Sequence, residues 1–168
     1  MDEVNSAYEQ AKKILQGDPN HSQALAFIGS VLFERGEHKE AITYLLKAIY
    51  QNSSNADYFS LLGLCYLGKN DFENSILAFD KAININPKAA DFFSNKAIAL
   101  FKIFKFKESV DCFTEAIKLD SNFFEAYNGR GNAFKAMQLF NEALHDYNKS
   151  IEINPNYSTA YFCKGNLY

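Results

Sequence analysis

The sequence predicts an all-α fold, a solenoid of about ten helices, and three observations support this fold class. A seven-residue phrase recurs at intervals of 34 residues, as KAIYQNS (47–53), KAININP (81–87), EAIKLDS (115–121) and KSIEINP (149–155). Columns of small and of large apolar residues repeat at the same interval. The apolar residues inside each unit also follow the spacing of a helix. A fixed period of about 20–50 residues is typical of a repeat array.

Each unit is predicted to be a helix, a turn and a second helix. In the unit that follows residue 55, one helical stripe consists of Phe59, Leu62, Gly63 and Tyr66, and a second consists of Ser75, Phe79, Ala82 and Ile83. The segment GKND (68–71) forms the turn between them, because Gly68 and Asn70 tolerate the left-handed backbone of a helix end. Pro87 ends the second helix, since it lacks a donor and its ring clashes with a continued helix.

One column of the repeat always contains a tiny residue. Its members are Gly29, Gly63, Ala97, Gly131 and Gly165. A large apolar or aromatic column accompanies it, consisting of Leu25, Phe59, Phe93, Tyr127 and Tyr161. We expect the tiny residues to lie where the two helices of a unit cross, because a bulky side chain there would force the helices apart.

Composition excludes several classes of protein. The chain has 168 residues, of which 22% are charged and 48% hydrophobic, as in a folded globular protein. Its formal net charge of −3 gives no overall attraction to nucleic acid or to anionic membranes. The chain opens with acidic residues and has no apolar run of about 20 residues, so we expect neither a secretory signal nor membrane insertion. Cys65, Cys112 and Cys163 form no CxxC motif, which favours a reducing, cytoplasmic setting without a disulfide framework.

The sequence also lacks the converging reactive groups that an enzyme needs. His21, His38 and His145 form no HExxH pair, and the carboxylates are scattered. The segment GRG (129–131) lies within a helical stripe, so it is interpreted as a packing pattern and not as a phosphate-binding loop. We therefore expect no catalytic residue, no cofactor and no metal site.

These residues resemble the tetratricopeptide repeat (TPR) family, whose pattern is a large aromatic, Leu-Gly, Tyr, then Ala, Phe, Ala and a closing Pro. The segment FSLLGLCYLGKNDFENSILAFDKAININP matches best, whereas Lys96-Ala97 replaces Leu-Gly in the next unit. The resemblance covers essentially the whole chain and implies one right-handed array over residues 1–168. It implies complete repeats at 22–55, 56–89, 90–123 and 124–157, a lone second helix at 1–21, and a lone first helix at 158–168.

The resemblance implies a peptide-binding groove lined by the first helix of each repeat. Carried over by position, the groove residues are Asp57, Ser60, Leu64, Leu67, Asp91, Asn95, Ile98, Phe101, Lys102, Glu125, Asn128, Asn132 and Lys135. Amide groups there are suited to a peptide backbone, and the apolar groups to a hydrophobic pocket. Asp57, Asp91 and Glu125 recur at the repeat interval and would suit a basic ligand. Their alternative explanation is structural, because a carboxylate in the first turn of a helix is favoured by the helix dipole.

One column changes character along the chain, from apolar to cationic. It reads Ile28, Leu62, Lys96, Arg130 and Lys164. One interpretation is a half-exposed position that tolerates either type, since long cationic side chains can bury their stems. The other is a basic lining in the C-terminal half.

The function predicted from these features is a non-enzymatic scaffold that binds a peptide or protein segment. The Lys, Asn and Arg set by which related domains clamp chaperone tails is absent in either register. An alternative is the N-terminal arm of a larger enzyme such as a glycosyltransferase, since the sequence stops at Tyr168 within a repeat. Another is head-to-tail self-association through the two end helices, which carry Val4, Ala7, Tyr8, Ala11, Ile14 and Leu15 at one end and Tyr161, Gly165 and Tyr168 at the other.

Overall fold

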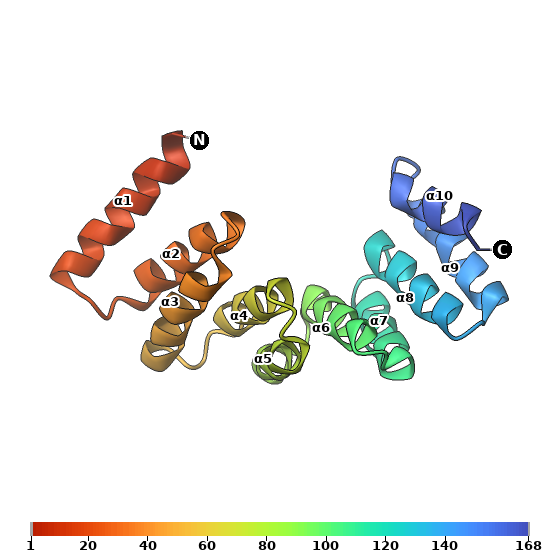
Figure 1. The fold of residues 1–168 in the computed structure, drawn as a ribbon, viewed down its shortest axis with the longest axis horizontal. Coiled ribbons are helices and arrows are strands. Elements are labelled where there is room, and N and C mark those ends of the chain that lie inside the picture. Colours follow the sequence, from red (N-terminus) through yellow and green to blue (C-terminus); the bar gives the residue numbers. More distant parts are fainter. Residues whose placement is uncertain (1, 168) are drawn as a thin grey trace. The chain divides into compact units, whose positions relative to one another are not determined.

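The computed structural model describes residues 2–167, which form ten helices and no strand (Figure 1). The all-α prediction is therefore confirmed. The chain divides into two compact units, Met1–Pro87 (unit 1) and Lys88–Tyr168 (unit 2). No helix in the described part of the chain is long and apolar enough to cross a membrane. Tyr168, which the sequence places in the C-terminal packing column, lies outside the described residues.

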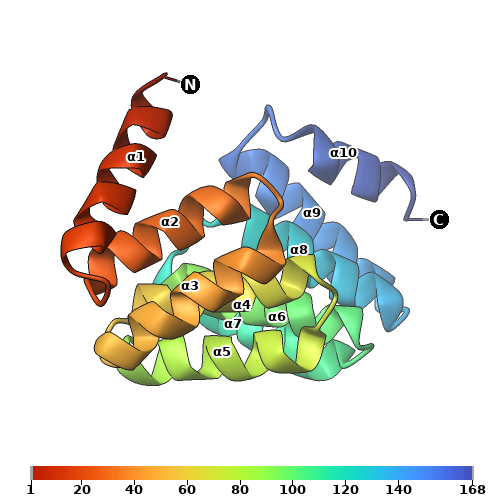
Figure 2. The ribbon, with the colours of Figure 1, turned by 60° about the vertical axis from the view of Figure 1, so that its left-hand side comes forward.

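Unit 1 consists of a single helix followed by two helical hairpins. Its helices are α1 (Asp2–Gly17), α2 (Ser22–Glu34), α3 (His38–Gln51), α4 (Ala56–Gly68) and α5 (Phe72–Ile85). The helices α2 and α3 pack on each other, as do α4 and α5, and α3 joins the two pairs by packing on α4 (Figure 2). Their shared core includes Leu25, Ile28 and Leu45, each almost wholly removed from solvent.

Unit 2 consists of two hairpins followed by a single helix. Its helices are α6 (Ala90–Lys102), α7 (Phe106–Leu119), α8 (Phe124–Ala136), α9 (Phe140–Ile153) and α10 (Ser158–Gly165). The first hairpin pairs α6 with α7, and the second pairs α8 with α9. The second hairpin is held to the first mainly by packing of α8 on α7, and α10 packs on α9. This arrangement places α6 and α8 in contact within unit 2.

Four members of the tiny column, Gly29, Gly63, Ala97 and Gly131, lie where the helices of a hairpin cross, as predicted, whereas a Cβ on Gly165 would meet nothing within 4 Å. A Cβ atom on Gly63 would lie 2.8 Å from Cε1 of Phe79, and one on Gly131 would lie 2.7 Å from Cε1 of Tyr147. Both distances are too short for two non-bonded carbon atoms, so residues 63 and 131 must lack a Cβ if the aromatic rings are to pack there. A buried hydroxyl strengthens the second crossing, because Ser75 Oγ donates a hydrogen bond of 2.8 Å to the carbonyl of Gly63. At the third crossing, Ala97 packs close to Phe113 and Ser109 Oγ donates to the Ala97 carbonyl at 2.8 Å.

The turn inside each hairpin contains one residue with left-handed backbone. These residues are Gly36, Asn70, Phe104 and Gln138, with φ values of 77°, 59°, 62° and 62°. The prediction of a left-handed turn was right for Asn70 and wrong for Gly68, which ends α4. Gly68 has another role, because a Cβ there would lie 2.6 Å from Nε2 of His38. At Phe104 the left-handed conformation is strained, and for residues other than glycine it costs about 1–2 kcal/mol.

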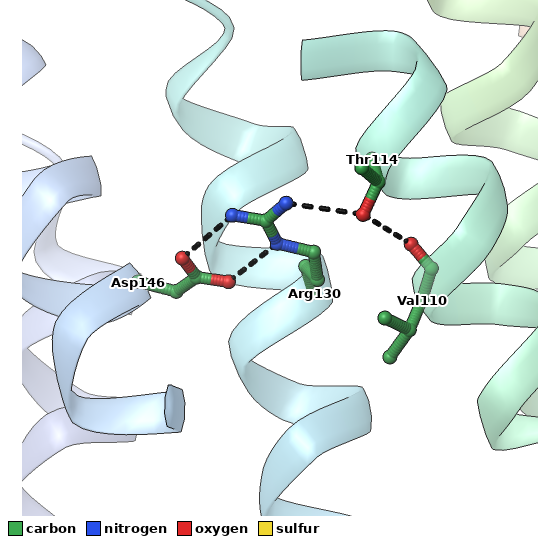
Figure 3. Close-up of polar contacts among 4 residues, drawn as sticks. All are labelled: Val110, Thr114, Arg130 and Asp146. Carbon is green, nitrogen blue, oxygen red and sulfur yellow. Dashed lines mark hydrogen bonds and ion pairs between the residues drawn. The ribbon is translucent and has the colours of Figure 1, made fainter. Parts of the chain in front are cut away.

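A polar network joins three helices of unit 2 (Figure 3). The Arg130 guanidinium on α8 donates to both carboxylate oxygens of Asp146 on α9, at 2.7 Å and 2.9 Å. Its Nη1 donates to Thr114 Oγ1 on α7 at 3.0 Å, and that hydroxyl donates to the Val110 carbonyl at 2.8 Å. The Asp146 side chain is only 1% exposed and that of Arg130 17%. Arg130 therefore does not form the basic groove lining considered above; its charge is satisfied inside the unit.

Substituting Gly131 with leucine is expected to destabilise the second hairpin of unit 2 strongly. The new side chain would have to displace Tyr147, and overpacking of this kind costs about 1–3 kcal/mol or more. Lys149→Gln is the matched surface control, because Lys149 forms a surface ion pair of 2.8 Å with Glu152, and its effect should stay within about 0.5 kcal/mol. Thermal melts of both variants would measure this, and equal melting temperatures would contradict the assigned crossing.

The Arg130–Asp146 pair is expected to behave as a unit when it is mutated. Asp146→Ala leaves a half-buried guanidinium without its partner, which typically costs about 3–5 kcal/mol. The double variant Arg130→Leu/Asp146→Ala should recover most of that loss, because Leu62 and Ala78 occupy the same two repeat positions in unit 1 and are both buried. Urea denaturation of the single and double variants would test the coupling, and additive losses would contradict it.

Candidate functional site

A cavity of 210 Å³ lies between α6, α7 and α8 of unit 2. Its lining consists of Ile98, Phe101, Lys102, Phe113, Gly129 and Asn132. The sequence analysis had selected four of these residues for the groove: Ile98, Phe101, Lys102 and Asn132. The structure therefore brings together, in one concave feature, part of the residue set that the family resemblance implied.

Phe113 and Gly129 belong to the cavity lining although the sequence analysis did not select them. Phe113 comes from α7, the second helix of its hairpin, and its side chain is 2% exposed. A Cβ on Gly129 would collide with the Phe113 ring, so the glycine lets that ring reach the wall of α8. The two glycines of GRG (129–131) could have indicated this contact. Gly131 packs on Tyr147 within its own hairpin, whereas Gly129 packs on Phe113 of the preceding hairpin.

The amide of Asn132 is held in one orientation. Tyr147 donates its hydroxyl proton to Asn132 Oδ1 at 2.8 Å. Burial raises the pKa of Tyr147 to about 12, so the hydroxyl stays protonated and remains a donor at neutral pH. With its oxygen engaged in this way, Asn132 has its NH₂ group left to offer to a ligand.

The polar groups of the cavity are therefore hydrogen-bond donors. Lys102 is the last residue of α6, is exposed, and contributes a cationic ammonium group. Asn132 contributes the amide NH₂ group described above. The remaining side chains, Ile98, Phe101 and Phe113, are apolar. Such a cavity is suited to an apolar group that is followed by an acceptor oxygen, such as a peptide carbonyl or a carboxylate.

Five predicted residues of unit 2 do not line this cavity: Asp91, Asn95, Glu125, Asn128 and Lys135. Asp91 and Glu125 are exposed in the first turns of α6 and α8, where the helix dipole favours an acid. Asn95 is half-buried on α6.

Asn128 and Lys135 have different surroundings within unit 2. Asn128 is 4% exposed, and its Oδ1 has no hydrogen-bond partner among the described residues. Lys135 donates from its Nζ to the backbone carbonyl of Asn166, at the end of α10. Its ammonium group therefore ties α8 to the last helix.

The predicted groove residues of unit 1 all lie on α4. Asp57 is exposed in the first turn of the helix, next to the N-cap Asn55, whose side chain accepts a hydrogen bond of 2.9 Å from the Asp57 amide. Ser60 is buried, and Leu64 and Leu67 are partly buried.

Comparison with family models identifies the repeat. Models described as tetratricopeptide repeat match residues 56–89, 90–123 and 124–157, and a model described as TPR repeat matches residues 29–70. Together the matches extend from residue 29 to residue 157. No curated protein matches the chain in sequence.

Solved structures share the fold at low sequence identity. The crystal structure of MamA has a TM-score of 0.84 at 22% identity, over 92% of this chain and 91% of MamA. YrrB, described as a TPR protein with an unusual peptide-binding site, has a TM-score of 0.83 at 21% identity, over 98% of this chain and 84% of YrrB. The first TPR domain of Spaghetti (RPAP3), bound to an HSP90 peptide, has a TM-score of 0.66 at 26% identity, over 69% of this chain and 92% of that one.

The helical hairpins, the tiny residues at their crossings and the family matches over residues 29–157 all lead to one assignment. The chain belongs to the tetratricopeptide repeat family.

Proposed function

We propose that this protein is a non-enzymatic interaction scaffold that binds a peptide segment on the first helices of unit 2, α6 and α8, with the cavity of unit 2 as the anchoring point. The observation that carries the proposal is the 210 Å³ cavity with apolar walls and donor groups at Lys102 and Asn132. An apolar side chain entering it would supply affinity, while the two donors would fix the adjacent peptide oxygen.

The structural relatives give this proposal general support. Two of them are described by their peptide sites: YrrB by an unusual peptide-binding site, and the Spaghetti domain by its bound HSP90 peptide. The chain lacks the cationic and amide set expected for a chaperone-tail clamp, so we propose a ligand of a different kind. Cys65 is a buried thiol outside any disulfide, and burial raises its pKa to about 12, which is compatible with a reducing cytoplasmic setting.

The cavity assignment predicts selective loss of binding in two variants. A peptide selected from a random library against the full chain should bind Phe101→Ala at least about tenfold more weakly, because an apolar wall is lost. Asn132→Asp should weaken it similarly, since a carboxylate still accepts the Tyr147 proton but presents an acceptor to the ligand. Fluorescence anisotropy would give the dissociation constants, and circular dichroism would check the fold.

The control for these variants is Leu119→Ala/Asn148→Ala, which alters two exposed residues of unit 2 outside the cavity. Its affinity should stay within about twofold of the parent. If the selected peptides bind the cavity variants as tightly as the parent, the ligand site lies elsewhere.

A second candidate function is head-to-tail self-association, favoured by exposed apolar side chains on both end helices. On α1, Val4 and Ile14 are 46% and 45% exposed, and on α10, Tyr161 and Phe162 are 50% and 71% exposed. A contact between unlike ends is heterologous, so it would form a ring or an open filament and not a two-fold dimer.

Self-association predicts a molar mass that rises with protein concentration. Tyr161→Glu should abolish the rise, because a carboxylate would be buried in the contact. Tyr50→Glu is the matched control, since Tyr50 on α3 is 86% exposed and lies on neither end helix. Multi-angle light scattering from dilute to concentrated protein decides the matter, and a parent that stays monomeric throughout would exclude this function.

A further inference from the structure

The turn between α6 and α7 combines exposed aromatic and cationic side chains. The sequence from Phe101 to Lys107 is FKIFKFK, which places three lysines and no acid in seven residues. Lys102, Lys105 and Lys107 are all exposed, and Lys105 forms a surface ion pair of 3.5 Å with Glu108. The local charge is therefore strongly positive although the whole chain carries −3.

Phe104 lies at the tip of this turn and projects into solvent. Its residue exposure is 79%, and its backbone is left-handed, with φ of 62°. The equivalent turns of unit 1 carry Gly36 and Asn70, which adopt this conformation readily. A bulky aromatic residue at such a position is both strained and exposed, so most of its apolar surface is left out of the fold. Strain of this kind is concentrated at functional sites.

Neighbouring aromatic rings hold Phe104 in place. The Phe104 and Phe106 rings meet edge to face, with centroids 6.0 Å apart, and Phe106 in turn packs on Phe101 at 5.3 Å. The tip is therefore an organised feature, with Phe104 outermost.

The second turn of unit 2, between α8 and α9, is also apolar. Met137, Leu139 and Phe140 are 37%, 37% and 41% exposed. In Figure 1 and Figure 2 both turns lie at the same edge of unit 2. The corresponding turns of unit 1 are polar, with Glu37 and Asp71 next to the left-handed residue. The aromatic and cationic turn at residues 101–107 and the apolar turn at residues 136–140 are together called the basic-aromatic edge.

The composition of this edge distinguishes between two kinds of partner. Lysine is depleted from the cores of protein–protein interfaces, where a strongly hydrated ammonium is costly to bury. Segments that lie on a membrane surface combine lysine with phenylalanine and leucine, because the apolar groups enter the headgroup region while the ammonium groups remain at the lipid phosphates. Projecting apolar tips between exposed lysines match the second pattern.

We propose that the basic-aromatic edge of unit 2 is a peripheral contact site for anionic lipid bilayers, with Phe104 entering the interfacial region and Lys102, Lys105 and Lys107 attracting the lipid phosphates. Such contact requires no membrane-spanning helix. Lys102 also lines the cavity of unit 2, whereas Phe104, Lys105 and Lys107 do not, so substitutions at these three positions test lipid contact separately from peptide binding.

Flotation with phospholipid vesicles tests the proposal on the full chain. The parent should bind vesicles of phosphatidylcholine with about 30% phosphatidylserine more tightly than pure phosphatidylcholine vesicles, and less tightly at high salt. Lys105→Gln/Lys107→Gln should weaken partitioning about thirtyfold. Phe104→Asn should weaken it about tenfold. The asparagine should also raise the melting temperature by about 2–4 °C, because the turn strain is relieved.

Two matched controls separate lipid contact from general effects. Lys13→Gln/Lys81→Gln removes the same charge from exposed positions of unit 1 and should bind as the parent does. Gln138→Asn changes the equivalent left-handed residue of the next turn without removing an aromatic group, and should also bind normally. The proposal is overturned if the parent shows no preference for anionic vesicles, if Phe104→Asn binds unchanged, or if the unit 1 lysine control loses as much binding. The first of these outcomes would favour an acidic protein surface as the partner.

Discussion

The close crossing of the two helices in each hairpin is the constraint on which both units depend. A glycine or alanine on the first helix leaves room for a large side chain from the second, as Gly63 does for Phe79 and Gly131 for Tyr147. The interior is close-packed, so this fit tolerates little change in volume. Because each crossing sets the angle between its two helices, it also sets where the neighbouring hairpin of the same unit can dock. The cavity of unit 2 is a product of that docking: Phe113, the partner of Ala97, reaches Gly129 on the next first helix.

At two repeat positions that are apolar in unit 1, the last hairpin of unit 2 has charged residues. Leu62 and Ala78 both belong to the apolar core of unit 1, whereas the same repeat positions of the last hairpin hold Arg130 and Asp146. A bidentate pair with Asp146 almost wholly buried contributes little net stability over an apolar pair, but it is intolerant of losing either partner. Through Thr114 the guanidinium also contacts the preceding hairpin, so it fixes the position of α8 relative to α7. That position in turn determines the spacing of Asn132 and Phe113 across the cavity.

The sequence predicted those features that repeat and missed those that occur once. The helices, the turns and the tiny column could be predicted from the 34-residue period, because the same packing of two helices recurs in every repeat. Ile98, Phe101, Lys102 and Asn132 could be selected because their positions in the repeat are known. The orientation of the Asn132 amide could not be predicted, because it depends on the hydroxyl of Tyr147, and the sequence contains several other tyrosines. The Arg130–Asp146 pair, the approach of Phe113 to Gly129 and the exposure of Phe104 likewise require coordinates, because they join residues from different periods or break the pattern of their column.

The hydrogen bond between Tyr147 and Asn132 connects the interior of the last hairpin to its surface. Tyr147 is wholly buried on α9, and Asn132 lies at the cavity, so a local opening of α9 would release the amide and let its oxygen compete with its NH₂ group for any bound molecule. Ligand occupancy and the opening equilibrium of α9 are then thermodynamically linked, and each bound molecule shifts that equilibrium towards the closed form. Slowed amide hydrogen exchange along α9, a helix that contributes no residue to the cavity lining, would be the remote sign of an occupied site.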